Sequence, residues 1–151
     1  MPPHGRISRR LEDELQEEAL IKQANLFFNT LVDGFKDLAA LVDGSLTVPE
    51  LRERSLLGSP TMYRAFAGAY YDLLDEDGGG LRMNRLQVIR FFESLAPFMA
   101  APVKDDSPWV TKTQQFPRGS TAPIARREDL KALTAALVAW AIAPPDWLKA
   151  A

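Results

Sequence analysis

The acidic, glycine-rich turn between two predicted helices comes nearest to a metal site. Asp75, Asp77 and Gly80 stand at the first, third and sixth positions of an EF-hand calcium loop. Gly79 takes the fifth position, where an oxygen ligand is usual, and Leu86 takes the twelfth, where a bidentate glutamate is needed. Because two ligands are missing, we expect a hydrated acidic turn and no calcium site.

This chain has few residues that could support nucleophilic catalysis. The sequence contains no cysteine, and its only histidine is His4. This composition excludes thiol catalysis, disulfides and cysteine-ligated zinc, and it leaves the predicted folded part without a histidine base for a triad. Catalysis would need a Lys, Asp or Tyr base that no motif identifies, and an enzyme would have an unusual site in the segment 97–124. We therefore expect a non-catalytic protein without a cofactor.

A cluster of cations near the C-terminus is the strongest candidate for binding phosphate or an acidic partner: Arg118, Arg126, Arg127 and Lys131. Arg127 and Lys131 are four residues apart and share one face of a predicted helix. Glu128 and Asp129 partly neutralise the cluster. Since the whole chain has a net charge of −2, any nucleic-acid binding would be local to this cluster.

A second basic group consists of Arg52, Arg54 and Arg64. We expect one of these arginines to form a buried ion pair with one of three aspartates: Asp33, Asp37 or Asp72.

The elements that position these residues are predicted to be helices. With 151 residues, of which 46% are apolar and 25% charged, the chain suits one globular domain. We predict an all-α fold, a compact bundle of four to six helices with a long proline-rich irregular segment before the last one. Residues 1–8 are expected to form a flexible arm and residues 9–151 a single helical domain.

Capping signals and periodicity set the expected helices. The first runs from an N-cap at Ser8 to residue 43, and Gly34 is expected to kink or split it. Thr47 and Glu50 form a capping-box pattern, and Ser59-Pro60 opens another helix. The remaining helices are expected over residues 84–95 and 125–143. The core is predicted to include one apolar stripe from each long helix: Phe28, Leu31, Phe66, Leu86, Phe92, Leu133 and Leu137.

Residues 97–124 contain five prolines and are predicted to be irregular, with Val103 and residues 109–111 in short extended pieces. Trp109 and Phe116 are costly to leave in water. We therefore expect the segment to be ordered against the helical body or a partner chain, with these two aromatic residues as candidate partner-facing anchors. Its polar stretch, residues 111–115, should stay exposed.

The stretch 24–74 resembles the C-terminal helical region of DGQHR-domain (DndB-like) proteins, which are tied to DNA phosphorothioate modification. The resemblance is carried by Phe27-Phe28-Asn29, by the run LTVPELR at 46–52 and by the small-residue helix at 65–74. The DGQHR motif itself is absent. The resemblance implies a stand-alone or truncated helical module in a DNA-modification or anti-phage defence system.

Three functions follow from these observations. The leading hypothesis is a non-catalytic accessory module that binds another protein or a second copy of itself. The alternative is a nucleic-acid-binding module that uses the cations at the start of the last helix, and the third is an enzyme with an unusual site. The longest uncharged run, 132–145, has 14 residues and is too short to cross a bilayer, and no secretory signal is visible. The cytoplasm is the expected location, without membrane contact.

Overall fold

The computed structural model describes residues 4–74 and 83–149. Within these ranges the chain forms eight α-helices and two 3₁₀ helices but no β-strand, which confirms the all-α prediction. In chain order they are α1 (His4–Gly34), α2 (Lys36–Asp43), α3 (Val48–Arg54), η1 (Leu56–Gly58), α4 (Pro60–Leu73), α5 (Arg85–Leu95), η2 (Ala96–Phe98), α6 (Pro108–Thr111), α7 (Arg127–Ile142) and α8 (Asp146–Lys149). The helices outnumber the four to six expected because Gly34 divides the first one and because α6 and α8 are four-residue helices.

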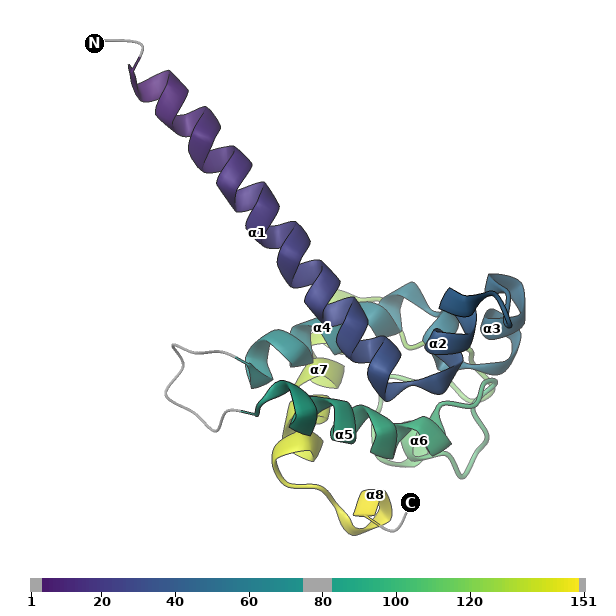
Figure 1. Cartoon of the computed structure of the whole chain (residues 1–151). Helices are drawn as coiled ribbons and strands as arrows, with labels where there is room; N and C mark the ends of the chain where they lie inside the picture. The colour runs from purple at the N-terminus through teal and green to yellow at the C-terminus, as the bar shows by residue number, and fades with distance from the viewer. Residues whose placement is uncertain (1–3, 75–82, 150–151) are drawn as a thin grey trace.

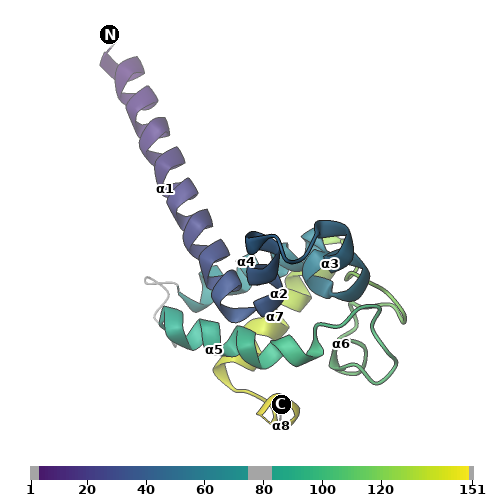
Figure 2. The same ribbon diagram turned by 45° about the vertical axis from the view of Figure 1, so that its right-hand side comes forward.

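The long helix α1 leaves the body of the molecule and extends away from it as a single rod (Figures 1 and 2). It begins at His4, so residues 4–8 are helical and the predicted start at Ser8 is wrong. It ends at Gly34, where Phe35 is extended with φ −119° and ψ 109° before α2 begins. The predicted split at Gly34 is therefore confirmed.

Side-chain caps fix the helices of the body where the sequence predicts them. The Thr47 side chain accepts from the amide of Glu50, and its hydroxyl donates to the Glu50 carboxylate at 2.8 Å. The Ser59 side chain accepts from the amide of Met62 at 3.2 Å. At α5, the capping box formed by Asn84 and Gln87 satisfies two amides that would otherwise lack partners.

Gly44 ends α2 with φ +86°, in the left-handed region that favours glycine. Beside it, the amide and the hydroxyl of Ser45 donate to the Asp43 carboxylate at 2.8 and 2.5 Å. These hydrogen bonds hold the pKa of Asp43 below its usual value. They close the turn that leads to α3.

The centre of the body is an aromatic cluster contributed by three different parts of the chain. The rings of Phe35, Phe66 and Phe92 lie with centroids 5.3 to 5.5 Å apart. Each of these side chains is buried. The cluster therefore joins the start of α2 to α4 and α5.

Five core predictions are confirmed, since all of these residues are buried: Leu31, Phe66, Phe92, Leu133 and Leu137. Two are wrong, because Phe28 is 40% exposed and Leu86 is 55% exposed. The body contacts α1 through Phe27, whose ring lies 5.3 Å from that of Tyr70, and Phe28 points to another side of the helix. In α5 the buried face is centred on Val88, Phe92 and Leu95, and this leaves Leu86 on the exposed side of the helix.

The irregular segment before α7 is ordered against the body, as predicted. Its start is held by backbone hydrogen bonds from Leu56 N to Met99 O at 2.8 Å and from Ala101 N to Arg54 O at 2.9 Å. At Val103 the extended conformation stays a prediction, although this residue exchanges backbone hydrogen bonds with residues 119–120. The extended prediction is wrong for residues 109–111, because the Ser107 side chain caps the short helix α6 there.

Candidate functional site

The two predicted partner-facing anchors of the irregular segment lie in the core instead. Trp109 is 1% exposed and Phe116 is 6% exposed, and their ring centroids are 5.2 Å apart. The Trp109 ring also contacts Trp140 of α7, and its Nε1 donates to the carbonyl of Phe98 at 2.8 Å. Because the helical body already covers both side chains, neither offers a surface to a partner.

The predicted cation cluster lies at the surface and is partly paired with acids. Arg126 precedes α7 and donates from Nε to the Asp129 carboxylate at 3.0 Å. Arg118 lies in the preceding loop and faces Asp105 at 4.0 Å. Both arginine side chains are more than three-quarters exposed, so these pairs contribute little to stability.

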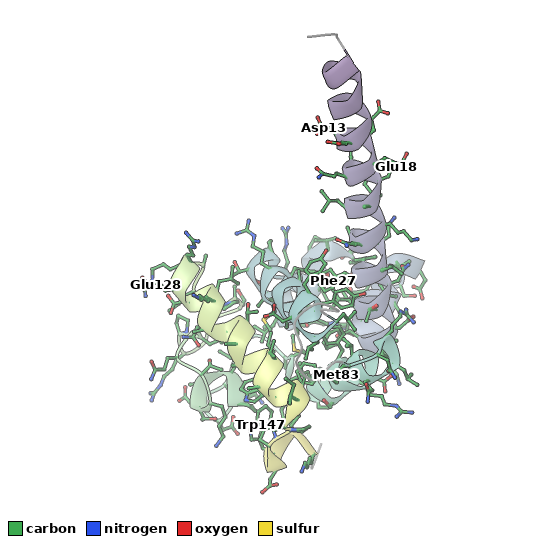
Figure 3. All side chains as sticks on the ribbon, turned by 90° about the vertical axis from the view of Figure 1, so that its left-hand side faces the viewer. Asp13, Glu18, Phe27, Met83, Glu128 and Trp147 are labelled. Atoms are coloured by element: carbon green, nitrogen blue, oxygen red, sulfur yellow. The ribbon has the colours of Figure 1, made fainter. Side chains whose placement is uncertain are left out.

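Arg127 and Lys131 occupy the first two turns of α7, and both are exposed. Glu128 stands between them in sequence, and Figure 3 shows it at the N-terminal end of α7. The structure thus gathers three of the four predicted cations at the start of one helix. Arg118 makes its ion pair within the irregular segment and not with that helix.

An open groove of about 610 Å³ lies where α1, α2, α5 and η2 meet. Its apolar surface includes Phe35, Leu57 and Met99, and its charged groups are three acids and one cation: Asp33, Asp37, Glu93 and Lys36. The charged lining of this groove is therefore mostly acidic.

Two of these carboxylates pair with arginines of the body. Asp33 pairs with Arg85, and Asp37 pairs with Arg54 at 3.3 Å. One of the arginine–aspartate pairs that the sequence prediction allowed, Arg54 with Asp37, is therefore present. The expectation that it is buried is wrong, because the two side chains are 56% and 46% exposed.

A second groove, of about 370 Å³, lies between α5 and the C-terminal end of the chain. Phe91, Ala141 and Leu148 form buried parts of its lining, and two exposed cations, Arg90 and Lys149, stand beside them. None of the described residues that line it is acidic. The two grooves therefore differ in the charge that they present.

The N-terminal part of α1 is a third surface. Every residue from 12 to 26 is exposed, and several of them carry large apolar side chains: Leu15, Leu20, Ile21 and Leu26. Figure 3 shows Asp13 and Glu18 on this part of the helix and Phe27 where it meets the body. We call residues 12–26 the arm.

The arm was missed by the sequence prediction, although a signal for it exists. The segment 12–18 contains five acidic residues, and it directly precedes apolar positions that continue the core-facing stripe of α1. Such a stripe predicts burial, but it does not say whether the covering surface belongs to the same chain. The structure shows that within the described chain nothing covers it.

The described residues offer little support for a metal site or for acid–base catalysis. They hold no group of three or more His, Cys, Asp or Glu side chains that could bind a metal ion. The predicted acidic turn at 75–80 lies outside them. Burial raises the pKa of the Tyr63 phenol, so this tyrosine stays protonated at neutral pH and is a poor base. No helix in the described part of the chain is long and apolar enough to cross a membrane.

No family model, curated protein or solved structure matches the chain. A functional proposal therefore depends on the sequence and on the geometry described above.

Proposed function

We propose that this chain is a non-catalytic helical interaction module whose contact element is the arm. The observation that carries the proposal is the exposure of Leu20 and Ile21, which are 63% and 54% exposed on a helix that extends away from the body (Figure 1). Burying one such side chain contributes about 1.5–3 kcal/mol. A partner that covered both would therefore gain substantial binding energy.

The physics of an isolated helix supports the same proposal. A single helix in water is marginally stable, because helical stability in proteins comes mainly from packing of an apolar face. The arm carries exposed apolar side chains, and they pack against nothing in the described chain. Association would supply the missing packing and would hold the arm helical.

The proposed setting is a DNA-modification or anti-phage defence system. It rests on the resemblance of residues 24–74 to the helical region of DGQHR-domain proteins. Since the DGQHR motif is absent from this sequence, chemistry attributed to that part of the family is not transferred. The proposal is an accessory role beside other proteins of such a system.

Site-specific cross-linking in the native host tests the proposed contact element. A photo-reactive amino acid placed at Leu20 should give a discrete cross-linked product, because this side chain would lie in the interface. The matched control places the same group at Gln114, which is exposed on the irregular segment of the body. A cross-linking yield at Leu20 no higher than at Gln114 would contradict the proposal.

Nucleic-acid binding is the second candidate, and the exposure of Arg127 and Lys131 on one face of α7 favours it. Gel-shift titrations across a salt series test it directly. Two phosphate contacts from these side chains predict a slope of about −2 in log K against log salt. The variant Arg127→Ala/Lys131→Ala should reduce that slope, and the absence of any shift in the wild type would eliminate this candidate.

A further inference from the structure

One face of the arm carries acidic residues followed by apolar residues. Asp13, Glu17, Leu20 and Ala24 follow one another at steps of four, three and four, so they lie on a common side of α1. Phe27 continues this face into the body, where its ring contacts Tyr70. The face that packs on the body therefore runs outward onto the exposed arm.

The groove between α5, α7 and α8 complements this face of the arm, because it is lined by apolar residues and cations. Its apolar lining includes Met83, Phe91 and Leu148, while its charged lining residues are Arg90 and Lys149. Its volume of about 370 Å³ falls in the range of pockets that hold small ligands, so it can take aliphatic side chains.

The lining of this groove contains no carboxylate among the described residues. Asp146, at the start of α8, is exposed but does not line the groove. The groove is therefore an apolar surface flanked by two cations.

Charge distinguishes this groove from the other one. The groove at the α1–α2 junction is lined by three acids (Asp33, Asp37 and Glu93) and one cation (Lys36), so it favours an acidic helix less than a groove lined only by cations does. The α5–α8 groove presents cations, which would attract Asp13 and Glu17 of the arm. Complementary charge fixes the partner and the register of an interface more than its raw affinity.

The arm of one molecule lies clear of its own body, so it does not occupy its own groove (Figures 1 and 2). We propose that the occupant is a second copy of this chain: the arm of each copy lies in the α5–α8 groove of the other. This deepens the proposed function and rests on it. Reciprocal exchange of two arms gives a closed two-fold dimer in which each contact is made twice. The small net charge of −2 allows two copies to approach without strong repulsion.

Charge reversal on each surface of the full-length protein tests the exchange. Asp13→Lys/Glu17→Lys alters the arm, and Arg90→Glu/Lys149→Glu alters the groove. Sedimentation equilibrium of the wild type should give a dimer. Each variant alone should dimerise at least about tenfold more weakly, because like charges then meet across the interface.

Mixing the two variants gives the sharpest result. The unaltered arm of one variant then meets the unaltered groove of the other, and the two altered surfaces meet each other with opposite charges. The mixture should therefore recover a heterodimer close to the wild-type affinity. A matched control, Glu53→Lys/Glu128→Lys, reverses two exposed acids of the body and should dimerise like the wild type. Circular dichroism checks that every variant is folded.

Three outcomes would overturn the inference. A wild type that stays monomeric at millimolar concentration excludes the second copy. A groove variant that dimerises like the wild type excludes the groove and indicates pairing between arms. A mixture that does not recover the heterodimer excludes the exchange. If the wild type is monomeric while Leu20 still cross-links to another host protein, only this inference fails; if Leu20 cross-links to nothing, the proposed function fails as well.

Discussion

At the scale of single residues, Trp109 connects the irregular segment to the helical body in two ways. Its ring packs between Phe116 and Trp140, with centroids 5.2 and 5.7 Å away, and its Nε1 donates to the Phe98 carbonyl. Packing and hydrogen bonding can be separated by substitution, because phenylalanine keeps an aromatic ring but lacks the donor.

Trp109→Ala should lower the free energy of unfolding by about 3–5 kcal/mol, the usual cost of truncating a buried aromatic residue. Trp109→Phe should cost less, about 1–3 kcal/mol, since it mainly leaves the Phe98 carbonyl without its partner. Urea denaturation of the two variants and the wild type measures both values. Equal losses for the two variants would mean that the hydrogen bond, and not the packing, fixes the segment.

Phe28 and Leu86 show what residue-level periodicity leaves open. Each stands at a position that the helical repeat assigns to an apolar face, yet each is exposed. The repeat gives the direction of a side chain around its helix, whereas burial also depends on where the neighbouring helices end.

At the scale of elements, Gly34 is required by a close approach between α1 and α5. A methyl group added at Gly34 would stand 2.5 Å from the Phe92 Cβ and 3.3 Å from the Ile89 carbonyl oxygen. The separation of the first helix into α1 and α2 therefore coincides with the point at which its backbone touches another helix.

Gly34→Ala should destabilise the protein by about 1–3 kcal/mol, because the added methyl group forces α1 and α5 apart. Thermal melts or urea denaturation measure the change. Asn29→Ala is the matched control, since this exposed residue lies on the same helix and its replacement should change stability little. A Gly34→Ala variant at least as stable as the wild type would show that helical propensity outweighs the close approach.

The sequence was sufficient to predict the elements that local signals define. The caps at Thr47, Ser59 and Asn84 and the left-handed glycine at Gly44 stand at or next to the predicted ends of helices. The start of α1 was not predictable in this way, because the structure carries the helix through Ser8. A capping residue marks where a helix can begin, but it does not prevent one from beginning earlier.

The candidate site was less predictable than the fold. The cations near Arg126 and the neutralising Asp129 were found from the sequence, and the structure adds Asp105 as the partner of Arg118. The α5–α8 groove joins Arg90 to Lys149, which are distant in sequence and carry no shared motif. Only the packing of α5 against α8 makes them neighbours, so no local pattern could reveal the groove.

At the scale of the whole molecule, the arm and the body should behave as separate parts in the stability of a monomer. Deleting residues 1–18 should leave the free energy of unfolding unchanged, because residues 12–18 are exposed. Leu31→Ala is the contrasting variant and should cost about 2–5 kcal/mol, because this leucine of α1 is fully buried.

The measurement must be made at a concentration at which the chain is monomeric, since association stabilises the folded state by mass action. At higher concentration the wild type should melt at a higher temperature than the deletion variant, because the wild type forms the dimer and the variant lacks part of the arm. At the monomer concentration the two melting temperatures should be equal. A deletion that destabilised the monomer would show that residues 1–18 contribute to the body.

The projecting α1 also affects how the molecule moves through a liquid. A rod attached to a rounded body increases translational friction, so a monomer of 16.8 kDa should elute earlier from a gel-filtration column than a sphere of the same mass. Its elution volume would then resemble that of a larger particle without any self-association. In the dimer with exchanged arms, each α1 rod would pack against the body of the partner. The dimer should therefore have a lower frictional ratio than the monomer, although its mass is twice as large.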